Sequence, residues 1–484
     1  MTKERPFAFV PDLLYIGGQW REASDGSRFV VTDPATGDML ASVASASAAD
    51  AVTAVEAATK AGHDWATVPA RERAEILRHA FESMIKHRDD LAELIVRENG
   101  KSWDDALAEV KYAAEFFRWY SEEGVRVAGQ IQTAPDGDKR ILVIHQPIGT
   151  SVLVTPWNFP AAMATRKIAP ALAAGCAVVL KPASDTPLTA LAIAHLLAES
   201  GVPEGVVNVI PARRSGEAVR AMLRHPETRK LSFTGSTEVG RALLREASEQ
   251  IINVSMELGG NAPFLVFEDA DLEAAVEGAV VAKMRNGGQS CIAANRFFIH
   301  SSLYDEFADR FAEELSALCI GHGMDQSVKL GPMINDAAVS DISELVSQSV
   351  AAGANVLTGG KPIVGPGAFF PPTVLTGVSA QDPILAHEVF GPVAPLVAFD
   401  TEDEAISLAN ATPFGLASYV YTTDLVRALR VSEALETGMV GVNRGFISDP
   451  AAPFGGVKQS GLGREGGHEG LHEFMETKYI AVDW

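Results

Sequence analysis

The stretch SVLVTPWNFPAAMATRKIAPALAAGCAVVLKP, residues 151–182, predicts a strand, a helix and another strand in close succession. A valine-rich run at 151–155 ends at a proline, an alanine-rich helical stretch covers 161–174, and an apolar run follows at 177–182. Strands and helices that alternate with short loops are typical of a parallel sheet built from βαβ units. The alternation continues in a helix at 187–200, a strand at 206–211, a helix at 215–224 and a strand at 230–235.

The segments on either side extend this α/β pattern. Apolar residues recur at helical spacing from about residue 48 to 122, and a β-rich run lies at 141–145. After residue 257 a helix, AVEGAVVAKMRN, a strand, RFFIH, and an amphipathic helix, LYDEFADRFAEELSAL, follow one another, and a helix and a strand share 402–424. We therefore expect a second α/β unit. The C-terminal HEFMETKYIAVDW reads as a β-type tail, of a kind that often pairs with another subunit.

Composition limits the class of protein. A chain of 484 residues is too long for one hydrophobic core and predicts about two or three domains. The net charge of −22 argues against non-specific binding to nucleic acid or to an anionic membrane. The longest apolar run, 168–180, is shorter than the roughly 20 residues of a membrane span. The N-terminus lacks the apolar core of a signal peptide, and three cysteines make no disulfide framework. We expect a cytoplasmic protein with reduced thiols and no metal site.

Two glycine-rich segments compete as a dinucleotide-binding loop. GLGREG, 461–466, matches G-x-G-x-x-G, but no strand leads into it, so we reject it. In KLSFTGSTEVG, 230–240, a strand runs into Gly235 and Ser236, and a helix begins there. Free N–H groups at a helix N-terminus suit a diphosphate, although Ser236 could equally be an ordinary helix cap. Lys181 and Ser184 follow a neighbouring strand at its carboxyl end, where α/β folds bind ligands, but Lys181 could also be a solvated loop lysine.

Cys291, in GGQSCIAANR at 287–296, is the candidate nucleophile. It lies among small and polar residues, whereas Cys176 and Cys319 have apolar neighbours. The glycines at 287–288 permit unusual φ angles and a close approach of the backbone to a substrate. A thiol becomes a useful nucleophile when its thiolate is favoured. The alternative is a buried, inert cysteine, which is the commoner fate of this residue.

Two further polar residues follow predicted strands in apolar surroundings. Glu257, between Met256 and Leu258, could have a raised pKa and act as a base, or it could be an ion-paired glutamate. The amide of Asn158, in TPWNFP, could donate to a developing oxyanion, or it could belong to a proline-bounded turn.

Together these stretches resemble a known family. TPWNFP, KPAS, FTGSTEVG, ELGGNAPF, GGQSC, EVFGPV and PFGGVKQSGLGRE occur in the order and at about the spacing seen in the aldehyde dehydrogenase superfamily. NFPAAMATRKIAPALAAG, KMRNGGQSC and VNRGFISDPAAPFGG are more narrowly similar to the succinate-semialdehyde dehydrogenases. The resemblance spans nearly the whole chain and rests on many separate motifs.

The resemblance implies a covalent mechanism. Cys291 attacks the aldehyde carbon to give a thiohemiacetal, and the Asn158 amide and the Cys291 N–H hold the oxyanion. Hydride passes to the nicotinamide, a thioester remains, and Glu257 activates the water that releases the acid. Covalent capture divides one difficult step into two easier ones. A cysteine hydrolase would use the same thiol and carboxylate without a nicotinamide, and this is the alternative from another enzyme class.

The resemblance also implies a cofactor site and a substrate. The cofactor-binding residues are Thr155, Pro156, Trp157, Lys181, Ser184, Gly235, Ser236, Leu258, Glu388 and Phe390. KPAS has a serine where NAD-preferring relatives often have glutamate, so we expect NADP, with NAD possible. Arg166, Arg285 and Ser448 would bind the carboxylate of succinate semialdehyde, although structural ion pairs are the alternative for both arginines. Arg444 could widen acceptance to glutarate semialdehyde, and Ala293 stands where some relatives carry a second, redox-active cysteine.

The implied fold is aldehyde dehydrogenase-like α/β, with two Rossmann-like domains and a small β oligomerisation arm. An NAD(P)-binding domain would cover 1–124 and 147–256, and a catalytic domain would cover 257–462. The arm would consist of 125–146 and 463–484 and would join a homodimer or a homotetramer.

Overall fold

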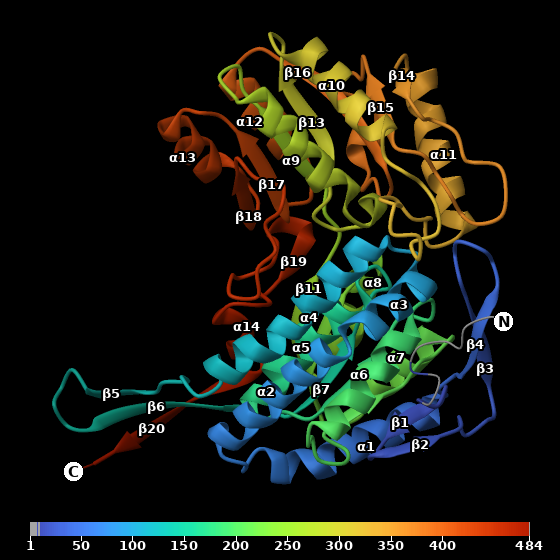
Figure 1. The fold of residues 1–484 in the computed structure, drawn as a ribbon. Helices are drawn as coiled ribbons and strands as arrows, with labels where there is room; N and C mark the ends of the chain where they lie inside the picture. The colour runs from blue at the N-terminus through green and yellow to red at the C-terminus, as the bar shows by residue number, and fades with distance from the viewer. Residues whose placement is uncertain (1–6, 8–9, 484) are drawn as a thin grey trace.

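A computed structural model describes residues 7 and 10–483 of the chain. It contains two large sheets in separate halves of the molecule and a three-stranded arm that projects from the first half (Figure 1). Helices cover the faces of both sheets, as parallel βαβ connections require (Figure 1). The expected α/β fold with two large sheets and a small β arm is therefore confirmed.

The first sheet has eight strands in the order β19-β11-β10-β7-β8-β9-β1-β2, of which β7 to β11 run parallel. These strands span β1 Leu14–Ile16, β2 Gln19–Arg21, β7 Thr150–Val154, β8 Val178–Lys181, β9 Val207–Val209, β10 Thr228–Thr234, β11 Asn253–Glu257 and β19 Gly461–Leu462. The predicted alternation is confirmed, with helices α5 Pro160–Ala174, α6 Pro187–Glu199, α7 Ser215–Leu223 and α8 Thr237–Ser248 between the strands. The sequence reasoning did not foresee the antiparallel edge strands β1 and β2.

The N-terminal helices form a layer over this sheet. They are α1 Ala48–Trp65, α2 Ala70–Lys86, α3 Arg88–Asn99 and α4 Trp103–Glu123, which confirms the helical pattern predicted for 48–122. A hairpin of β3 Arg28–Thr32 and β4 Met39–Ala44 precedes them. Helix α4 lies against α5, which is buried along its whole length. The layer therefore reaches the loop that joins β7 to α5.

The second sheet has seven strands in the order β14-β15-β16-β13-β12-β17-β18. These strands span β12 Ala262–Val266, β13 Ala294–His300, β14 Asn355–Thr358, β15 Thr373–Thr376, β16 Val393–Phe399, β17 Ala417–Tyr421 and β18 Met439–Val442. Its helices are α9 Leu272–Met284, α10 Tyr304–Ser316, α11 Asp336–Ala351, α12 Glu402–Asn410 and α13 Leu425–Ala434. The predicted second α/β unit is confirmed, and its core is built around stacked aromatic rings such as those of Phe264 and Tyr421, 4.9 Å apart.

The arm consists of β5 Gln130–Thr133, β6 Arg140–Pro147 and β20 Met475–Val482. The predicted C-terminal strand is confirmed, and it pairs antiparallel with β6 of its own chain from Met475 opposite Pro147 to Val482 opposite Arg140. Because β20 lies at one edge of this sheet, its outer side has no strand partner among the described residues. Short helix α14, Glu469–His472, leads the chain into the arm (Figure 1).

No helix in residues 7 and 10–483 is long and apolar enough to cross a bilayer.

GLGREG, which matches a dinucleotide loop literally, has a structural role instead. It begins with β19, which pairs antiparallel with β11 at the edge of the first sheet. A Cβ on Gly461 would lie 2.0 Å from the Met256 carbonyl oxygen, so glycine is required for that close pairing. Rejecting this segment as a phosphate loop agrees with the structure.

Candidate active site

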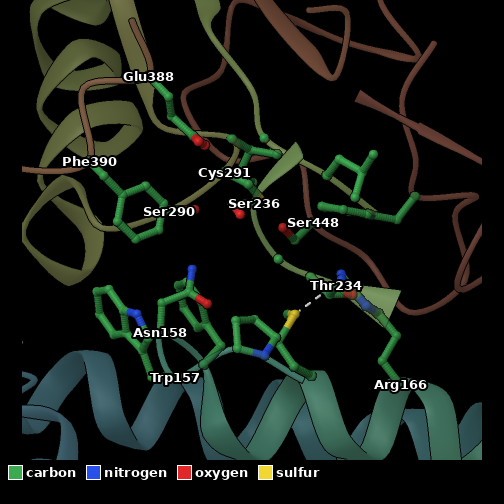
Figure 2. Close-up of a pocket in the computed structure, with 18 of the residues that line it drawn as sticks. Trp157, Asn158, Arg166, Thr234, Ser236, Ser290, Cys291, Glu388, Phe390 and Ser448 are labelled. Atoms are coloured by element: carbon green, nitrogen blue, oxygen red, sulfur yellow. Dashed lines mark hydrogen bonds between the residues drawn. The ribbon is translucent and has the colours of Figure 1, made fainter. Parts of the chain in front are cut away.

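A cavity lies between the two sheets, and residues from both halves of the molecule line it. Figure 2 shows Trp157 and Asn158 on the side of α5, facing Cys291, Glu388 and Phe390 from the second half. Most of the predicted site residues line this cavity together: Pro156, Trp157, Asn158, Arg166, Gly235, Ser236, Leu258, Arg285, Cys291, Glu388, Phe390 and Ser448. Thr155, Lys181, Ser184 and Glu257 are not among the lining residues.

The loop that carries Cys291 depends on left-handed backbone conformations. A short 3₁₀ segment, Arg285–Gly288, follows α9, and within it Asn286, Gly287 and Gly288 have φ angles of 52°, 62° and 74°. A Cβ on Gly288 would lie 2.2 Å from the carbonyl oxygen of Gly391. The glycines therefore provide both the unusual φ angles and the close approach that the sequence predicts for this turn.

The Cys291 carbonyl lies directly against Gly260, in the connection between the two sheets. A Cβ on Gly260 would be 2.1 Å from that oxygen, and one on Gly259 would be 2.8 Å from the Glu388 carboxylate. The Gly260 N–H donates to Glu388 Oε1 at 3.0 Å. Because Gly259 and Gly260 have no side chains, the loop that carries Cys291 and the Glu388 carboxylate can pack directly against them.

The Cys291 thiol is protonated in this environment. Burial, together with the negative charges of Glu388 and Glu257, raises its pKa to about 12, although Arg166 opposes the shift. Cys176 is also buried, with its pKa raised to about 11 by burial, and Cys319 is exposed. Cys291 therefore differs from the other two cysteines because it lines the cavity, and not because its thiol is already deprotonated. A proton acceptor is needed before it attacks.

Asn158 and the Cys291 backbone supply the two expected donors to an oxyanion. The Asn158 side-chain amide donates to the Gln289 carbonyl at 3.1 Å, and its Oδ1 has no hydrogen-bond partner. Within the described part of the chain, no group accepts from the Cys291 N–H. Both donors therefore lie at the cavity wall beside the thiol, where a carbonyl oxygen bound to Cys291 would develop charge.

Glu257 ends β11 behind the cavity wall. Only 2% of the residue is exposed, and neither carboxylate oxygen has a hydrogen-bond partner. Burial and the neighbouring Glu465 raise the pKa of Glu257 well above its usual range, as the sequence predicts, while Arg166 opposes them. The carboxylate is turned toward Gly455, where a Cβ would lie 2.8 Å from Glu257 Oε1. Glu257 therefore does not line the cavity in this conformation, and a contact with a group bound there would require its side chain to rotate.

Arg166 lines the cavity with Asn158, as its place eight residues later in the sequence suggests, but its charge is already paired. Its Nε forms an ion pair with Glu465 Oε2 at 2.5 Å, although the angles at these two atoms do not meet those of a hydrogen bond. Burial alone would lower the pKa of Arg166, but Glu465 raises it above its usual value. Lys167 also pairs with Glu465. The structural ion pair considered for Arg166 is therefore present.

Glu465 is a functional neighbour that the sequence reasoning missed. It lies inside GLGREG, which was considered only as a phosphate loop, and its partners are almost three hundred positions earlier in the chain. No local pattern indicates such a contact.

Arg285 has a different environment, because its guanidinium contacts two aromatic rings instead of a carboxylate. Its guanidinium carbon lies 4.6 Å from the Phe159 ring centre and 4.8 Å from that of Phe446. No carboxylate in the described residues is within ion-pair distance of it. Cation–π contacts hold a guanidinium while leaving its N–H edges free to bind an anion. Ser448 lines the same cavity (Figure 2).

The residues for the nicotinamide end of a cofactor also meet at this cavity, and they fit such a group. The rings of Trp157 and Phe390 stand edge to face, 5.5 Å apart. Burial raises the pKa of Glu388 to about 7, and its carboxylate lines the cavity as an acceptor for hydroxyl groups. Ser236 caps α8 by accepting from the Val239 N–H, so the helix cap considered for it is present, and both Gly235 and Ser236 line the cavity.

Lys181 and Ser184 lie away from this cavity, at the carboxyl end of β8. Lys181 is buried rather than a solvated loop lysine, and burial lowers its pKa to about 8. Ser184 lines a separate pocket with Arg213, whose guanidinium donates to the Ser184 hydroxyl at 3.5 Å. The sequence reasoning missed Arg213, which lies in the loop after β9 and meets Ser184 only in the folded sheet.

Comparisons with known proteins agree with this geometry. Residues 20–480 match the model of the aldehyde dehydrogenase family. The chain is 49% identical to the NADP-dependent succinate-semialdehyde dehydrogenase of Escherichia coli, over 96% of this chain and 97% of that protein. It is 48% identical to the glutarate-semialdehyde dehydrogenase of Pseudomonas aeruginosa, over 97% of each. The crystal structure of succinate-semialdehyde dehydrogenase from Burkholderia pseudomallei superimposes with a TM-score of 0.98 at 48% identity, and the alignment covers 100% of both chains.

The chain therefore belongs to the aldehyde dehydrogenase family. NAD or NADP is the oxidant typical of this family, so a cysteine hydrolase without a redox role is disfavoured.

The contact between Gly260 and Cys291 gives a first prediction. Gly260→Ala places a methyl group against a backbone oxygen that cannot rotate away, so the nucleophile loop must shift. A displacement of about 1 Å is enough to lower turnover roughly 100-fold. Steady-state oxidation of an aldehyde measures the loss. Gly216→Ala is the control, because a Cβ there meets nothing within 4 Å and should leave turnover unchanged. Near-normal turnover of Gly260→Ala would contradict the assigned contact.

Proposed function

We propose that this protein oxidises succinate semialdehyde to succinate with NADP, through a covalent intermediate on Cys291. The observation that carries the proposal is Arg285, which lines the same cavity as Cys291 and Asn158 and has a guanidinium without a carboxylate partner in the described residues. The cavity thus has fixed positive charge on its wall in a strongly acidic protein, as a substrate with an aldehyde and a carboxylate requires.

The first chemical step belongs to Cys291 and its neighbours. The thiol proton passes to a water molecule, the Cys291 sulfur forms a bond to the aldehyde carbon, and the carbonyl oxygen becomes an oxyanion. The Asn158 amide would exchange its contact with the Gln289 carbonyl for that oxyanion, and the Cys291 N–H would supply the other donor. Donors fixed in a dry site stabilise the developing charge more than water does.

The cofactor residues prepare the oxidation that follows. A bound nicotinamide would supply the acceptor for the hydride that leaves the aldehyde carbon. Trp157 and Phe390 offer ring faces at that position, and the Glu388 carboxylate suits the adjoining ribose hydroxyls. Thr155, Pro156, Gly235, Ser236 and Leu258 would complete the contact surface.

Glu257 is proposed to act only after hydride has left. Its raised pKa makes it a good acceptor for the proton of a water that attacks the thioester carbon. The carboxylate must first turn from Gly455 into the cavity. The water oxygen then bonds to the thioester carbon, the carbon–sulfur bond breaks, and the acid leaves.

NADP is proposed over NAD because of the groups around Ser184. The 2′-phosphate of NADP needs donors and positive charge, and the Ser184 hydroxyl and the Arg213 guanidinium, which line one pocket, would provide them. Lys181, at the end of β8, would add a further positive charge. An acidic residue at position 184 would repel the same phosphate.

Glutarate semialdehyde is the runner-up substrate, favoured by the equally similar Pseudomonas aeruginosa relative. It carries one more methylene between the aldehyde and the carboxylate. Arg444 is exposed, donates to the Phe446 carbonyl at 2.6 Å and does not line the cavity, so it gives no direct contact to a longer substrate. The ratio of kcat/KM for the two semialdehydes distinguishes them, and a higher value for glutarate semialdehyde would favour the runner-up.

We propose that the arm carries the contacts of a homodimer or homotetramer. Its strands expose large apolar side chains, among them Ile131 at 76% and Tyr479 at 54%. The outer edge of β20 also has unpaired backbone groups. Both features suit a second copy of the chain.

Replacing Arg285 tests the substrate. Arg285→Ala should lower kcat/KM for succinate semialdehyde about 10- to 150-fold, because a charge-assisted hydrogen bond contributes about 1.5–3 kcal/mol. Oxidation of butanal, which lacks the carboxylate, should change little. Arg430→Ala is the control, since that exposed arginine pairs with Glu402 on α13 and α12. An equal loss on both aldehydes would assign Arg285 to the fold.

The pH dependence of deacylation tests Glu257. Its base form is the deprotonated carboxylate, and the raised pKa moves that form to higher pH. Wild-type steady-state turnover should therefore rise with pH, and its midpoint should lie above the usual pKa range of a glutamate. Glu257→Gln should keep the first burst of reduced cofactor, accumulate a thioester detectable by mass spectrometry after acid quenching, and lose subsequent turnover. Cys291→Ala should abolish the burst itself. Wild-type steady turnover in Glu257→Gln would mean that another base is used.

Cofactor choice is tested at Arg213. Arg213→Ala should weaken NADP binding about 10- to 150-fold, as expected for loss of a charge-assisted hydrogen bond, and should leave NAD binding nearly unchanged. Arg214→Ala is a matched control, because its side chain is 81% exposed and lies near Glu217. Ser184→Glu should invert the preference toward NAD. Titration by protein fluorescence measures each dissociation constant. Equal losses for both cofactors, or no response to Ser184→Glu, would contradict this site.

A further inference from the structure

A buried lysine lies directly behind the proposed oxyanion donor. The side chain of Lys101, in the turn between α3 and α4, has no exposed surface. Its ammonium donates to the backbone carbonyl of Asn158 and to Glu109 Oε2, the latter at 2.6 Å, and lies 4.0 Å from the ring centre of Phe159. Two of the three N–H donors of the ammonium are used in these hydrogen bonds, and its charge also lies over the aromatic ring. Two of these three partners belong to the loop that presents the Asn158 amide.

Glu109, the partner of Lys101, holds the other end of the same loop. Its Oε1 accepts from the N–H groups of Ala161 and Ala162, at 2.8 and 3.2 Å. These groups open α5, which has no side-chain cap of its own at Phe159. A carboxylate at a helix N-terminus satisfies free N–H groups and opposes the positive end of the helix dipole. The ion pair thus fixes Asn158 from both sides, through its carbonyl and through the helix that follows.

The same helix also contacts the nucleophile loop. Asp105, one turn before Glu109 on α4, accepts from the Asn286 N–H at 2.8 Å. The Asn286 side-chain amide in turn donates to the carbonyls of Asn158 and Gln289, at 2.9 and 3.1 Å. The start of α4 is therefore bonded to both segments that supply the oxyanion donors.

Stability alone explains this arrangement poorly. Burying a lysine and a glutamate removes both charges from water, and an apolar pair of similar volume often serves a fold as well or better. The ion pair does provide direction, because each of its hydrogen bonds has a defined partner in the Asn158 loop.

We propose that Lys101, held by Glu109, is a positioning residue that aims the Asn158 amide at the developing oxyanion. The inference rests on the oxyanion role proposed for Asn158. Lys101 touches neither substrate nor cofactor in this account, and its whole effect on the reaction passes through Asn158.

The test compares two reactions of the same thiol in the absence of cofactor. Acylation of Cys291 by p-nitrophenyl acetate forms a carbon–sulfur bond, releases nitrophenolate and passes through an oxyanion. Alkylation by iodoacetamide forms a carbon–sulfur bond, releases iodide and develops no oxyanion. Lys101→Met should slow acylation roughly 100-fold, as misplacement of a catalytic group by about 1 Å does, and should leave alkylation within about twofold.

A double-mutant cycle separates positioning from general disruption. Asn158→Ala alone should slow acylation about 100- to 1,000-fold, the usual loss for one oxyanion donor. In the Asn158→Ala background, Lys101→Met should have no further effect, because the amide that it aims is gone. Multiplication of the two effects, or an equal fall in alkylation, would overturn the inference while leaving the role of Asn158 intact. Normal acylation by Asn158→Ala would instead contradict the proposed function.

Matched variants keep the test informative if Lys101→Met is poorly folded. Lys230 is an equally buried lysine, bonded to Glu473 at 2.9 Å and to Asn253 at 2.6 Å, and it does not line the cavity. Lys230→Met should lower stability without changing the ratio of acylation to alkylation. Glu109→Gln keeps an acceptor for the α5 N–H groups but removes the charge that holds Lys101, and it should lower the same ratio. An unchanged ratio in Glu109→Gln would overturn the proposal, whatever the fate of Lys101→Met.

Discussion

The main chain passes from the first sheet to the second through residues 258–261. The arrangement of the active site depends on how little space this crossing leaves for side chains. β11 ends at Glu257 and β12 begins at Ala262, so the crossing carries the candidate base at one end. The room that side chains would need at Gly259 and Gly260 is taken by the Glu388 carboxylate and the Cys291 carbonyl. Four residues of backbone thereby contact the candidate base Glu257, the candidate nucleophile Cys291 and Glu388, a proposed cofactor ligand.

Burial then sets the protonation states of the site. Cys291, Glu257 and Glu388 are buried, so the charged forms of these acids are disfavoured and their pKa values are all raised. A neutral thiol reacts more slowly with electrophiles than a thiolate does, but it must lose its proton before it attacks an aldehyde. The cations nearby do not cancel this effect, because Glu465 engages Arg166 and Lys167. Arg285 is held by aromatic rings and has no carboxylate within ion-pair distance among the described residues, which is why it is proposed to bind the substrate.

The N-terminal helices contribute to the site although they add no strand to either large sheet. Helix α4 lies on α5 and reaches past it to the loops on both sides of the cavity. Tyr112 from the same helix lines the cavity directly. The layer therefore joins the half of the molecule with the first sheet to the loop that carries Cys291. The segments around Cys291 and Asn158 thus contact residues that come well before them in the chain.

The sequence by itself determined the α/β alternation, because strand and helix periodicity are local properties of segments such as 151–182. It also determined the family, since the motifs around Asn158, Glu257 and Cys291 are short and contiguous, and it indicated the turn glycines at 287 and 288. Tertiary structure alone decided which charges are free. Arg166 and Arg285 look alike in the sequence, yet one meets Glu465 and the other meets Phe159 and Phe446. Packing likewise decided that the Glu257 carboxylate points away from the cavity. It also decided that Arg213 contacts Ser184 and that Lys101 contacts Asn158. Electrostatic partners are chosen by distance in space, and no periodicity along the chain encodes that distance.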